Sequence, residues 1–421
     1  MGSNDWRTSA LLEEVQELRQ KIRNSNASES ITRANDDLAS FLIAIEPRLK
    51  EFGITRIADL TGLDIVGIPV YAAIRPNSRS LSVCQGKGLL HEVAKVSAIM
   101  EALEQAMAER AEDLIAVQAT KPQMRQYGWE CFDPEDSSDA SNVSPMGEAE
   151  RSWVPSISFT SGRTVLLPYE VVGLDFREPN PWDASTYRMN TIGLGAGRSL
   201  VQAVTHAALE VLERDATAFT DMLGIHPRFA RVLSYHRGQS AELDAAVQKV
   251  QRAGLDYVFI QHNADFDLPV IGTFVRDSGN VHNSRVYAGF ACRPCAHDAA
   301  LAALLEAVQS RAAQIAGSRE DLSDQDFGGG GAWPQTDRMP AATLHALDLH
   351  HGSCRTSALN KLRSAINAIL SVGADDIFIA PLGGPGEVRT VRVVAPGLGA
   401  ASRDGPTYLS ARTLGKLMNF S

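Results

Sequence analysis

The chain has 421 residues, of which 44% are hydrophobic and 21% are charged, and its formal net charge is −10. This composition is that of a globular protein with one large core or a few smaller ones, and the acidic balance argues against nucleic-acid binding. No apolar run reaches the length of a membrane span, and the N-terminus lacks a secretion signal, so we expect no membrane partner and a cytoplasmic location.

The N-terminal region carries an apolar stripe with helical spacing. Leu11, Val15, Leu18 and Ile22 share one face of residues 8–24, and charged side chains occupy the rest. Such a pattern is typical of a docking or dimer helix. We therefore predict an N-terminal helical extension over residues 1–55 and expect a homodimer or a multi-subunit assembly.

A first strand–loop–helix unit follows. Residues 68–74 and 81–84 are predicted as strands, residues 85–88 as a glycine-containing loop, and residues 91–114 as a helix. This helix carries Glu101 and Glu104, which are three residues apart and therefore share one face. The polar stretch 132–151 is predicted as an exposed loop.

A second unit has the same order. Short strands are predicted at 165–167 and 170–172, a glycine-containing loop at 190–198, and then a helix that carries Glu210 and Glu213. Both glutamate pairs lie among apolar residues, and a buried carboxylate is costly unless a cation meets it. The alternative is that Glu-x-x-Glu marks an ordinary solvated helix face. Two copies in matching apolar contexts favour a shared cation site.

The rest of the chain completes a mixed α/β fold with helices packed on mixed sheets. Strands are predicted at 257–261, 270–275, 286–290, 376–379 and 390–394, helices at 299–316 and 358–372, and a glycine-rich loop at 327–333. Cys292, Cys295 and nearby His297 resemble half of a zinc site. The other three of the five cysteines are isolated, so we interpret this group as incidental and the cysteine usage as that of a reducing compartment.

Clustered carboxylates without His or Cys favour Mg²⁺, which is usually completed by substrate phosphates. Cationic side chains suited to phosphate stand beside the glycine loops and on the helices: Lys87, Arg198, Arg214 and Arg311. No Gly-x-x-x-x-Gly-Lys-Ser/Thr loop is present. The residues thus predict a Mg²⁺–nucleotide site between two pseudo-repeated strand–loop–acidic-helix units, without defining the reaction.

These motifs, in this order, resemble those of the YcaO family. The resemblance is carried by Ser97-x-x-x-Glu101-x-x-Glu104, by residues 190–197 leading to Glu210-x-x-Glu213-Arg214, by Glu306-x-x-Gln309-x-Arg311, and by the closing segment 391–398. It spans about residues 56–400, which we take as a YcaO catalytic domain with a YcaO-like fold, followed by a C-terminal tail over 401–421.

The resemblance implies both a cofactor and a chemistry. ATP and Mg²⁺ would be bound, with Glu101, Glu104, Glu210 and Glu213 on the metal and Ser97, Arg214 and Arg311 on the nucleotide. YcaO enzymes phosphorylate a backbone amide oxygen, usually in a ribosomally made precursor peptide. A Cys, Ser or Thr nucleophile then gives an azoline, and sulfide with a TfuA partner gives a thioamide.

The sequence departs from the family pattern in two places. The second motif has Gly195, Gln202 and His206 where Ser, Glu and Gln are common, so a neutral amide stands at one expected metal ligand. His206 is interpreted equally well as a ligand or as a structural residue. The C-terminus also lacks the Pro-x-Pro-x-Pro tail of many azoline-forming members.

The segment 75–82 is most similar to the TfuA-associated branch, which favours thioamide formation. An azoline-forming cyclodehydratase and a non-catalytic scaffold subunit stay open as alternatives. No leader-binding module is recognisable in the sequence. We therefore expect a TfuA-like or leader-binding partner protein to recognise the precursor peptide.

Overall fold

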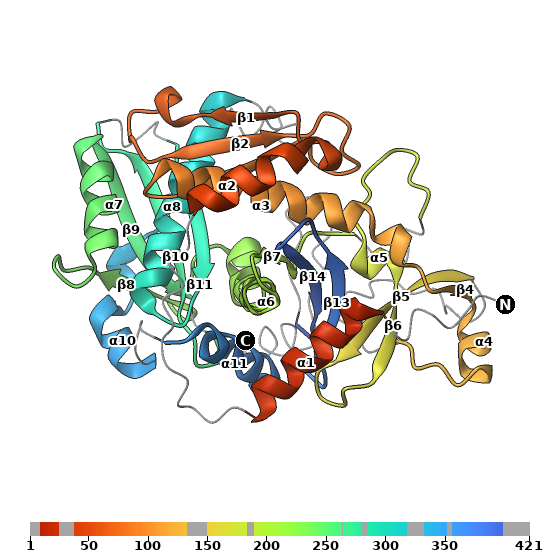
Figure 1. Cartoon of the computed structure of the whole chain (residues 1–421). Coiled ribbons are helices and arrows are strands. Elements are labelled where there is room, and N and C mark those ends of the chain that lie inside the picture. Colours follow the sequence, from red (N-terminus) through yellow and green to blue (C-terminus); the bar gives the residue numbers. More distant parts are fainter. Residues whose placement is uncertain are drawn as a thin grey trace. The chain divides into compact units, whose positions relative to one another are not determined.

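The computed structural model describes residues 9–24, 38–132, 150–182, 189–262, 264–279, 285–317, 332–351 and 356–398 (Figure 1). The chain forms two compact units, each assembled from separate stretches. The first contains residues 1–31, 103–222 and 357–421, and the second contains 32–102 and 223–356. Helix α3 (His91–Glu109) contributes its first part to the second unit and its last part to the first. The predicted mixed α/β class is confirmed.

The first unit is built on a six-stranded antiparallel sheet with the order β4-β5-β13-β14-β7 and β6 paired to β5. Its strands are β4 (Val117–Ala119), β5 (Arg151–Ser158), β6 (Thr164–Pro168), β7 (Leu194–Gly197), β13 (Phe378–Gly383) and β14 (Arg389–Val394). Its further helices are α1 (Ala10–Asn24), η4 (Ala111–Leu114), α4 (Lys121–Gln126), α5 (Tyr169–Val172), α6 (Leu200–Leu223) and α11 (Ala358–Ser371).

The predicted N-terminal helix is confirmed as α1, and it docks within its own unit. The buried side chains of α1 form the predicted apolar stripe, with Leu12 in place of Leu11, and the helix contacts β13 and β5. Arg19 donates to the Thr160 carbonyl at 2.7 Å, and Arg389 pairs with Glu14 at the same distance. The apolar face of α1 is therefore covered by the sheet.

The second unit contains two sheets. One has the order β1-β2-β3, and the other has the order β11-β10-β9-β8-β12, in which the β8–β12 pair is parallel. The strands are β1 (Arg56–Asp59), β2 (Val70–Ile74), β3 (Val83–Lys87), β8 (Ala230–Ser234), β9 (Leu255–His262), β10 (Val270–Asp277), β11 (Tyr287–Cys292) and β12 (Ala341–Thr343). The helices are α2 (Leu38–Ile45), η2 (Glu46–Phe52), η3 (Thr61–Leu63), α7 (Ala241–Arg252), α8 (Ala296–Ala316), η6 (Thr336–Arg338) and α10 (Leu344–His351).

Helices α7 and α8 cover one face of the five-stranded sheet. Successive residues of a strand point to opposite faces of a sheet, so each strand contributes to two clusters. Phe259 and Ile271 pack with these helices, whereas Ile260 and Phe274 belong to a separate cluster on the other face. Helix α8 also contacts β3 of the three-stranded sheet.

At three glycines, the backbone of a strand packs directly against the backbone of a helix. A Cβ on Gly86 of β3 would lie 2.0 Å from the Ala98 nitrogen of α3 and 2.3 Å from the Ala94 oxygen. Gly195 of β7 meets α6 in the same way, with the Ala203 oxygen at 2.4 Å. The third case is Gly289 of β11, which meets the Ala303 oxygen and the Ala307 nitrogen of α8. The predicted duplication thus has a third copy of its strand–helix contact.

Several predicted elements differ from those in the structure. Residues 85–87 and 194–197 were predicted as loops because they contain glycine, but they are strand residues in β3 and β7. Residues 170–172 were predicted as a strand and instead form the short helix α5, which begins directly after Pro168. The helix predicted over 91–114 ends at Glu109 and is followed by η4.

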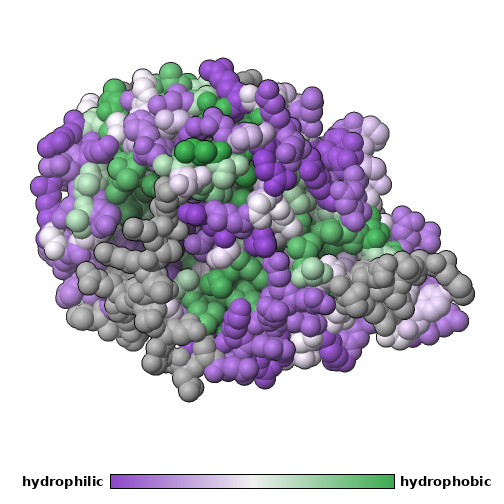
Figure 2. Space-filling view, in the orientation of Figure 1, coloured by the Kyte–Doolittle hydropathy of each residue, from purple (hydrophilic) through white to green (hydrophobic). Residues whose placement is uncertain are grey.

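Several predictions lie outside the described residues. These are the bulk of the loops at 132–151 and 327–333, and the tail at 401–421. Among the helices that are described, none has both the length and the apolarity of a membrane span. Hydrophilic side chains cover most of the face in Figure 2, interrupted by smaller hydrophobic areas.

Candidate functional site

The acidic pair on α6 lies within the first unit and is accompanied by its own arginine. Glu213 is buried, and the side chain of Glu210 is 20% exposed. The Arg214 Nε lies 3.9 Å from one carboxylate oxygen of each glutamate. Glu210 also accepts a hydrogen bond from the Gly193 N–H at 3.3 Å, so the glycine segment before β7 touches the acidic helix directly.

A buried arginine links this pair to the other acidic helix. Arg392 of β14 is 2% exposed, and the negative charges of Glu210 and Glu104 both act on it. Burial lowers its pKa to about 10, and the two carboxylates oppose that shift, so the guanidinium remains protonated at neutral pH. Glu104 of α3 and Glu210 of α6 therefore act on the same buried guanidinium.

The Arg392 guanidinium also holds the backbone around these carboxylates. It donates to the carbonyls of Ile192 at 2.5 Å and Asn190 at 2.7 Å, before β7, and to those of Val172 and Gly173 at 3.3 and 3.5 Å. The segment before β7 and the end of α5 are thereby tied to one side chain. Because carbonyl oxygens buried without donors are costly, this arrangement fixes both segments.

The two acidic pairs occupy equivalent places on their helices. Counted from the alanine whose nitrogen meets the strand glycine, Glu101 and Glu104 stand three and six positions beyond Ala98. Glu210 and Glu213 stand at the same offsets from Ala207. Glu101 and Glu104 are half-buried, and so is Ser97 one turn before Glu101. Each pair offers carboxylate oxygens, the ligands that a hard divalent cation prefers.

The predicted phosphate-binding cations outside the acidic helices all have acidic partners. The Lys87 ammonium is 3.0 Å from a carboxylate oxygen of Glu306 on α8. Arg198 pairs with Glu387 at 2.7 Å. These two cations would have to exchange or share a carboxylate in order to bind phosphate.

Arg311 is held more firmly than the other two. It donates to both carboxylate oxygens of Asp64, at 3.1 and 3.2 Å, and lies 3.4 Å from Asp277. Burial lowers the pKa of Arg311, but the charges of Asp64 and Asp277 outweigh it, so that the net shift is upward. Within the second unit, Arg311 therefore has a structural role, and its contact with a nucleotide stays a prediction.

Gln202 and His206 are exposed on α6. The Gln202 side-chain oxygen accepts a hydrogen bond from the Arg198 N–H at 2.9 Å, and the Gln202 N–H donates to the Ser199 hydroxyl. Gln202 thus closes the first turn of the helix. Its role as a metal ligand, and that of His206, stay predictions.

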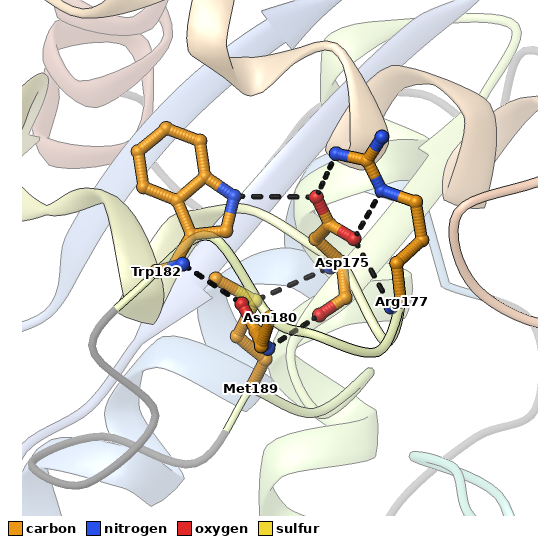
Figure 3. Close-up of polar contacts among 5 residues, drawn as sticks. All are labelled: Asp175, Arg177, Asn180, Trp182 and Met189. Carbon is orange, nitrogen blue, oxygen red and sulfur yellow. Dashed lines mark hydrogen bonds and ion pairs between the residues drawn. The ribbon is translucent and has the colours of Figure 1, made fainter.

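A polar cluster that the sequence analysis missed orders the segment after α5 (Figure 3). Asp175 is fully buried and accepts two hydrogen bonds from the Arg177 guanidinium, at 2.9 and 2.6 Å, and one from the Trp182 ring N–H at 3.3 Å. Burial raises the pKa of the Asp175 carboxyl, but the hydrogen bonds from Arg177 and Trp182 lower it by more. The Trp182 ring lies on Tyr169, with 3.8 Å between the ring centroids.

Leu174, in the same segment, donates its N–H to the Ala108 carbonyl of α3. The cluster therefore stabilises the segment after α5, which contacts Arg392 on one side and the end of α3 on the other. No local motif marks it, because Asp175, Arg177 and Trp182 lie in a segment without regular structure, and only their contacts reveal the pairing.

Comparison with known proteins shows what this chain is similar to. A model described as YcaO cyclodehydratase, ATP- and Mg²⁺-binding, matches residues 85–399. A Rhizobium leguminosarum bv. trifolii protein from the tfuA 3′ region is 32% identical over 381 residues, covering 86% of this chain and 87% of its own.

Two solved structures share the fold. YcaO from Methanopyrus kandleri, bound with AMPPCP and Mg²⁺, has a TM-score of 0.64 at 22% identity and covers 86% of this chain and 91% of its own. A heterocyclase in complex with substrate and cofactor has a TM-score of 0.66 at 17% identity, covering 95% of this chain and 58% of that protein.

Proposed function

Because the chain belongs to the YcaO family, with its ATP-dependent activity in peptide modification, we propose that it activates a peptide backbone amide for thioamide formation. The observation that carries the proposal is the shared position of Glu104 and Glu210 beside one buried guanidinium, with Glu213 and Arg214 on the same helix. Glu101, Glu104, Glu210 and Glu213 are the proposed Mg²⁺ ligands, and Lys87, Ser97, Arg198, Arg214 and Arg311 the proposed nucleotide contacts.

An amide oxygen is a weak nucleophile, so the reaction needs a positioned phosphoryl donor. Bound Mg²⁺–ATP would supply the γ-phosphoryl group and neutralise the charge that develops on it. The carboxylates would fix the metal, and Arg214, held between two of them, would reach the phosphate oxygens. The amide oxygen takes the phosphoryl group, sulfide adds to the amide carbon, and inorganic phosphate leaves with that oxygen.

The preference for sulfide rests on the relative from the tfuA 3′ region together with the segment 75–82. We propose that a TfuA-like protein is the partner and that a ribosomally made precursor peptide is the substrate. The second candidate is an azoline-forming cyclodehydratase, which the description of the matching family model favours. The two differ in whether sulfide or a Cys, Ser or Thr side chain attacks the activated amide.

The catalytic proposal predicts a specific loss in the Glu210→Gln variant. The substitution keeps the shape of the side chain but removes a charged Mg²⁺ ligand, so we expect thermal stabilisation by Mg²⁺–ATP to disappear and turnover to fall by about 10²-fold or more. Glu242→Gln is the matched control, because Glu242 is exposed in the first turn of α7.

Full Mg²⁺–ATP stabilisation in a folded Glu210→Gln protein would contradict the proposed site and would leave the non-catalytic scaffold as the better interpretation. The product is identified by mass spectrometry of the peptide after incubation with a TfuA-like partner, sulfide and ATP. Exchange of one oxygen for one sulfur supports the thioamide. Loss of one water per modified residue supports the azoline.

A further inference from the structure

A group of side chains able to ligate a metal lies at the start of α8, within the second unit. Cys295, His297 and Asp348 each offer one ligand atom, and these atoms lie within 4.8 Å of one another. Cys295 is the N-cap residue of α8, His297 is in its first turn, and Asp348 comes from α10. Cys295 and His297 are buried, and the Asp348 side chain is 14% exposed.

The carboxylate organises this cluster. One Asp348 oxygen accepts a hydrogen bond from the Ala296 N–H at 2.6 Å, and the other pairs with the His297 Nδ1. The His297 Nε2 lies 3.2 Å from the Gln239 side-chain oxygen. Two residues of one turn are thus oriented by a single carboxylate from another helix. The contact holds both side chains close together, and Asp348 would exchange its contact with the imidazole for the metal.

We propose that Cys295, His297 and Asp348 form a Zn²⁺ site when Cys295 is reduced. A thiolate, an imidazole and a carboxylate together favour Zn²⁺ over Mg²⁺, and water would complete the tetrahedron. Zinc bonds of about 2.0–2.3 Å separate tetrahedral ligand atoms by roughly 3–4 Å, so closure about the metal takes side-chain shifts of about 1 Å. The N-terminal end of α8 also favours the thiolate.

The proposed site is controlled by oxidation. Cys295 is disulfide-bonded in this structure, and a disulfide sulfur has no thiolate to offer. Reduction by a small dithiol transfers two electrons and two protons, breaks the S–S bond and leaves two thiols, while the dithiol becomes a disulfide. Zn²⁺ then displaces the proton of the Cys295 thiol. Oxidised protein and zinc-bound protein are therefore exclusive states.

Cobalt(II) provides the test, because a Co²⁺–thiolate bond gives a near-ultraviolet charge-transfer band that carboxylate sites cannot produce. The full-length protein is stripped of metal with a chelator, reduced with a dithiol, freed of reductant and titrated with Co²⁺. We expect the band in the reduced protein, its displacement by Zn²⁺, and its absence from oxidised protein. Cys295→Ser and His297→Asn should abolish or strongly weaken it.

Cys292→Ser is the matched control, since Cys292 is a buried cysteine that forms no disulfide, three residues before Cys295, and the variant should keep the band. Glu210→Gln should also keep it, which separates this test from that of the proposed ATP site. A folded, reduced protein without the band would overturn the proposal and leave Asp348 as a helix cap only. A band that persists in Cys295→Ser would overturn it too. If Cys295→Ser fails to fold, equal spectra of reduced and oxidised wild-type protein would overturn it.

Discussion

The buried Arg392 of β14 has two roles in the first unit. Its guanidinium satisfies carbonyls from the end of α5 and from the segment before β7, and its charge faces Glu104 and Glu210. A buried cation of this kind is tolerated only when its donors are used and its charge is balanced. Both conditions are met here, so Arg392 positions backbone that borders the proposed metal ligands.

Replacing Arg392 by Met should lower the free energy of unfolding by about 3 kcal/mol or more, because buried carbonyls and carboxylates lose their donor and counter-charge. Denaturant unfolding of the purified variant measures this loss. Arg389→Met is the control: Arg389 lies on the same strand, but its pair with Glu14 is 30–39% exposed and should contribute about 1 kcal/mol or less. Equal losses in both variants would contradict the structural role given to Arg392.

The sequence identified candidate functional residues better than it identified the partners with which they pair. The two glutamate pairs were recognisable because charged residues at helical spacing stand out among apolar neighbours. The partners Glu306 and Asp64, which hold Lys87 and Arg311, come from distant positions and leave no local signal. Arg392 was overlooked because one arginine in a valine-rich strand looks like an ordinary outward-facing residue.

The strand–glycine–helix contact is the recurring element of the fold. In each copy, a strand glycine lies between the oxygen of one alanine and the nitrogen of another four residues later on the helix. Sequence reasoning assigned Gly86 and Gly195 to loops, since glycine is a common turn residue, and placed Gly289 in a strand without explaining it. Their actual purpose is tertiary: the missing side chain lets β3, β7 and β11 approach α3, α6 and α8. Only the packed structure separates the two explanations.

Gly195→Ala should therefore destabilise the protein by about 1–3 kcal/mol or more, because the new Cβ would lie 2.4 Å from the Ala203 oxygen and would push α6 from β7. The shift would also displace Glu210, so Mg²⁺–ATP stabilisation should weaken in the same variant. Thermal unfolding with and without Mg²⁺–ATP measures both effects. Gly62→Ala is the control, since a Cβ at that position would meet no atom within 4 Å; a loss as large there as at Gly195 would contradict the packing explanation.

The division of the whole molecule into two units illustrates what composition cannot reveal. The predicted boundaries at residues 55 and 400, which stay predictions, follow shifts along the chain. Each compact unit is assembled from separate stretches of the chain, and the continuous helix α3 contributes residues to both. A helix has no linker-like composition at its midpoint, so a sequence scan has no signal there. The order of the motifs indicated the family but not the division of the chain into two compact units.

The buried His262 of β9 makes the stability of the protein depend on pH in the acid range. Burial lowers its pKa from 6.5 to about 4. As the pH falls from 6.5 toward 4, His262 is protonated in the unfolded chain but stays neutral in the folded protein, so the free energy of unfolding decreases. Below the folded pKa this group adds no further slope. The full difference corresponds to about 3 kcal/mol.

Urea unfolding at neutral pH and at a pH between the two pKa values measures this effect. His262→Gln cannot titrate, so the variant should lose less stability on acidification than the wild type, even if it is less stable at neutral pH. His236→Gln, at an exposed histidine, should keep the wild-type response. Because the comparison is between pH responses rather than absolute stabilities, a packing defect at position 262 does not obscure it. A His262→Gln response equal to that of the wild type would show that other groups govern acid unfolding.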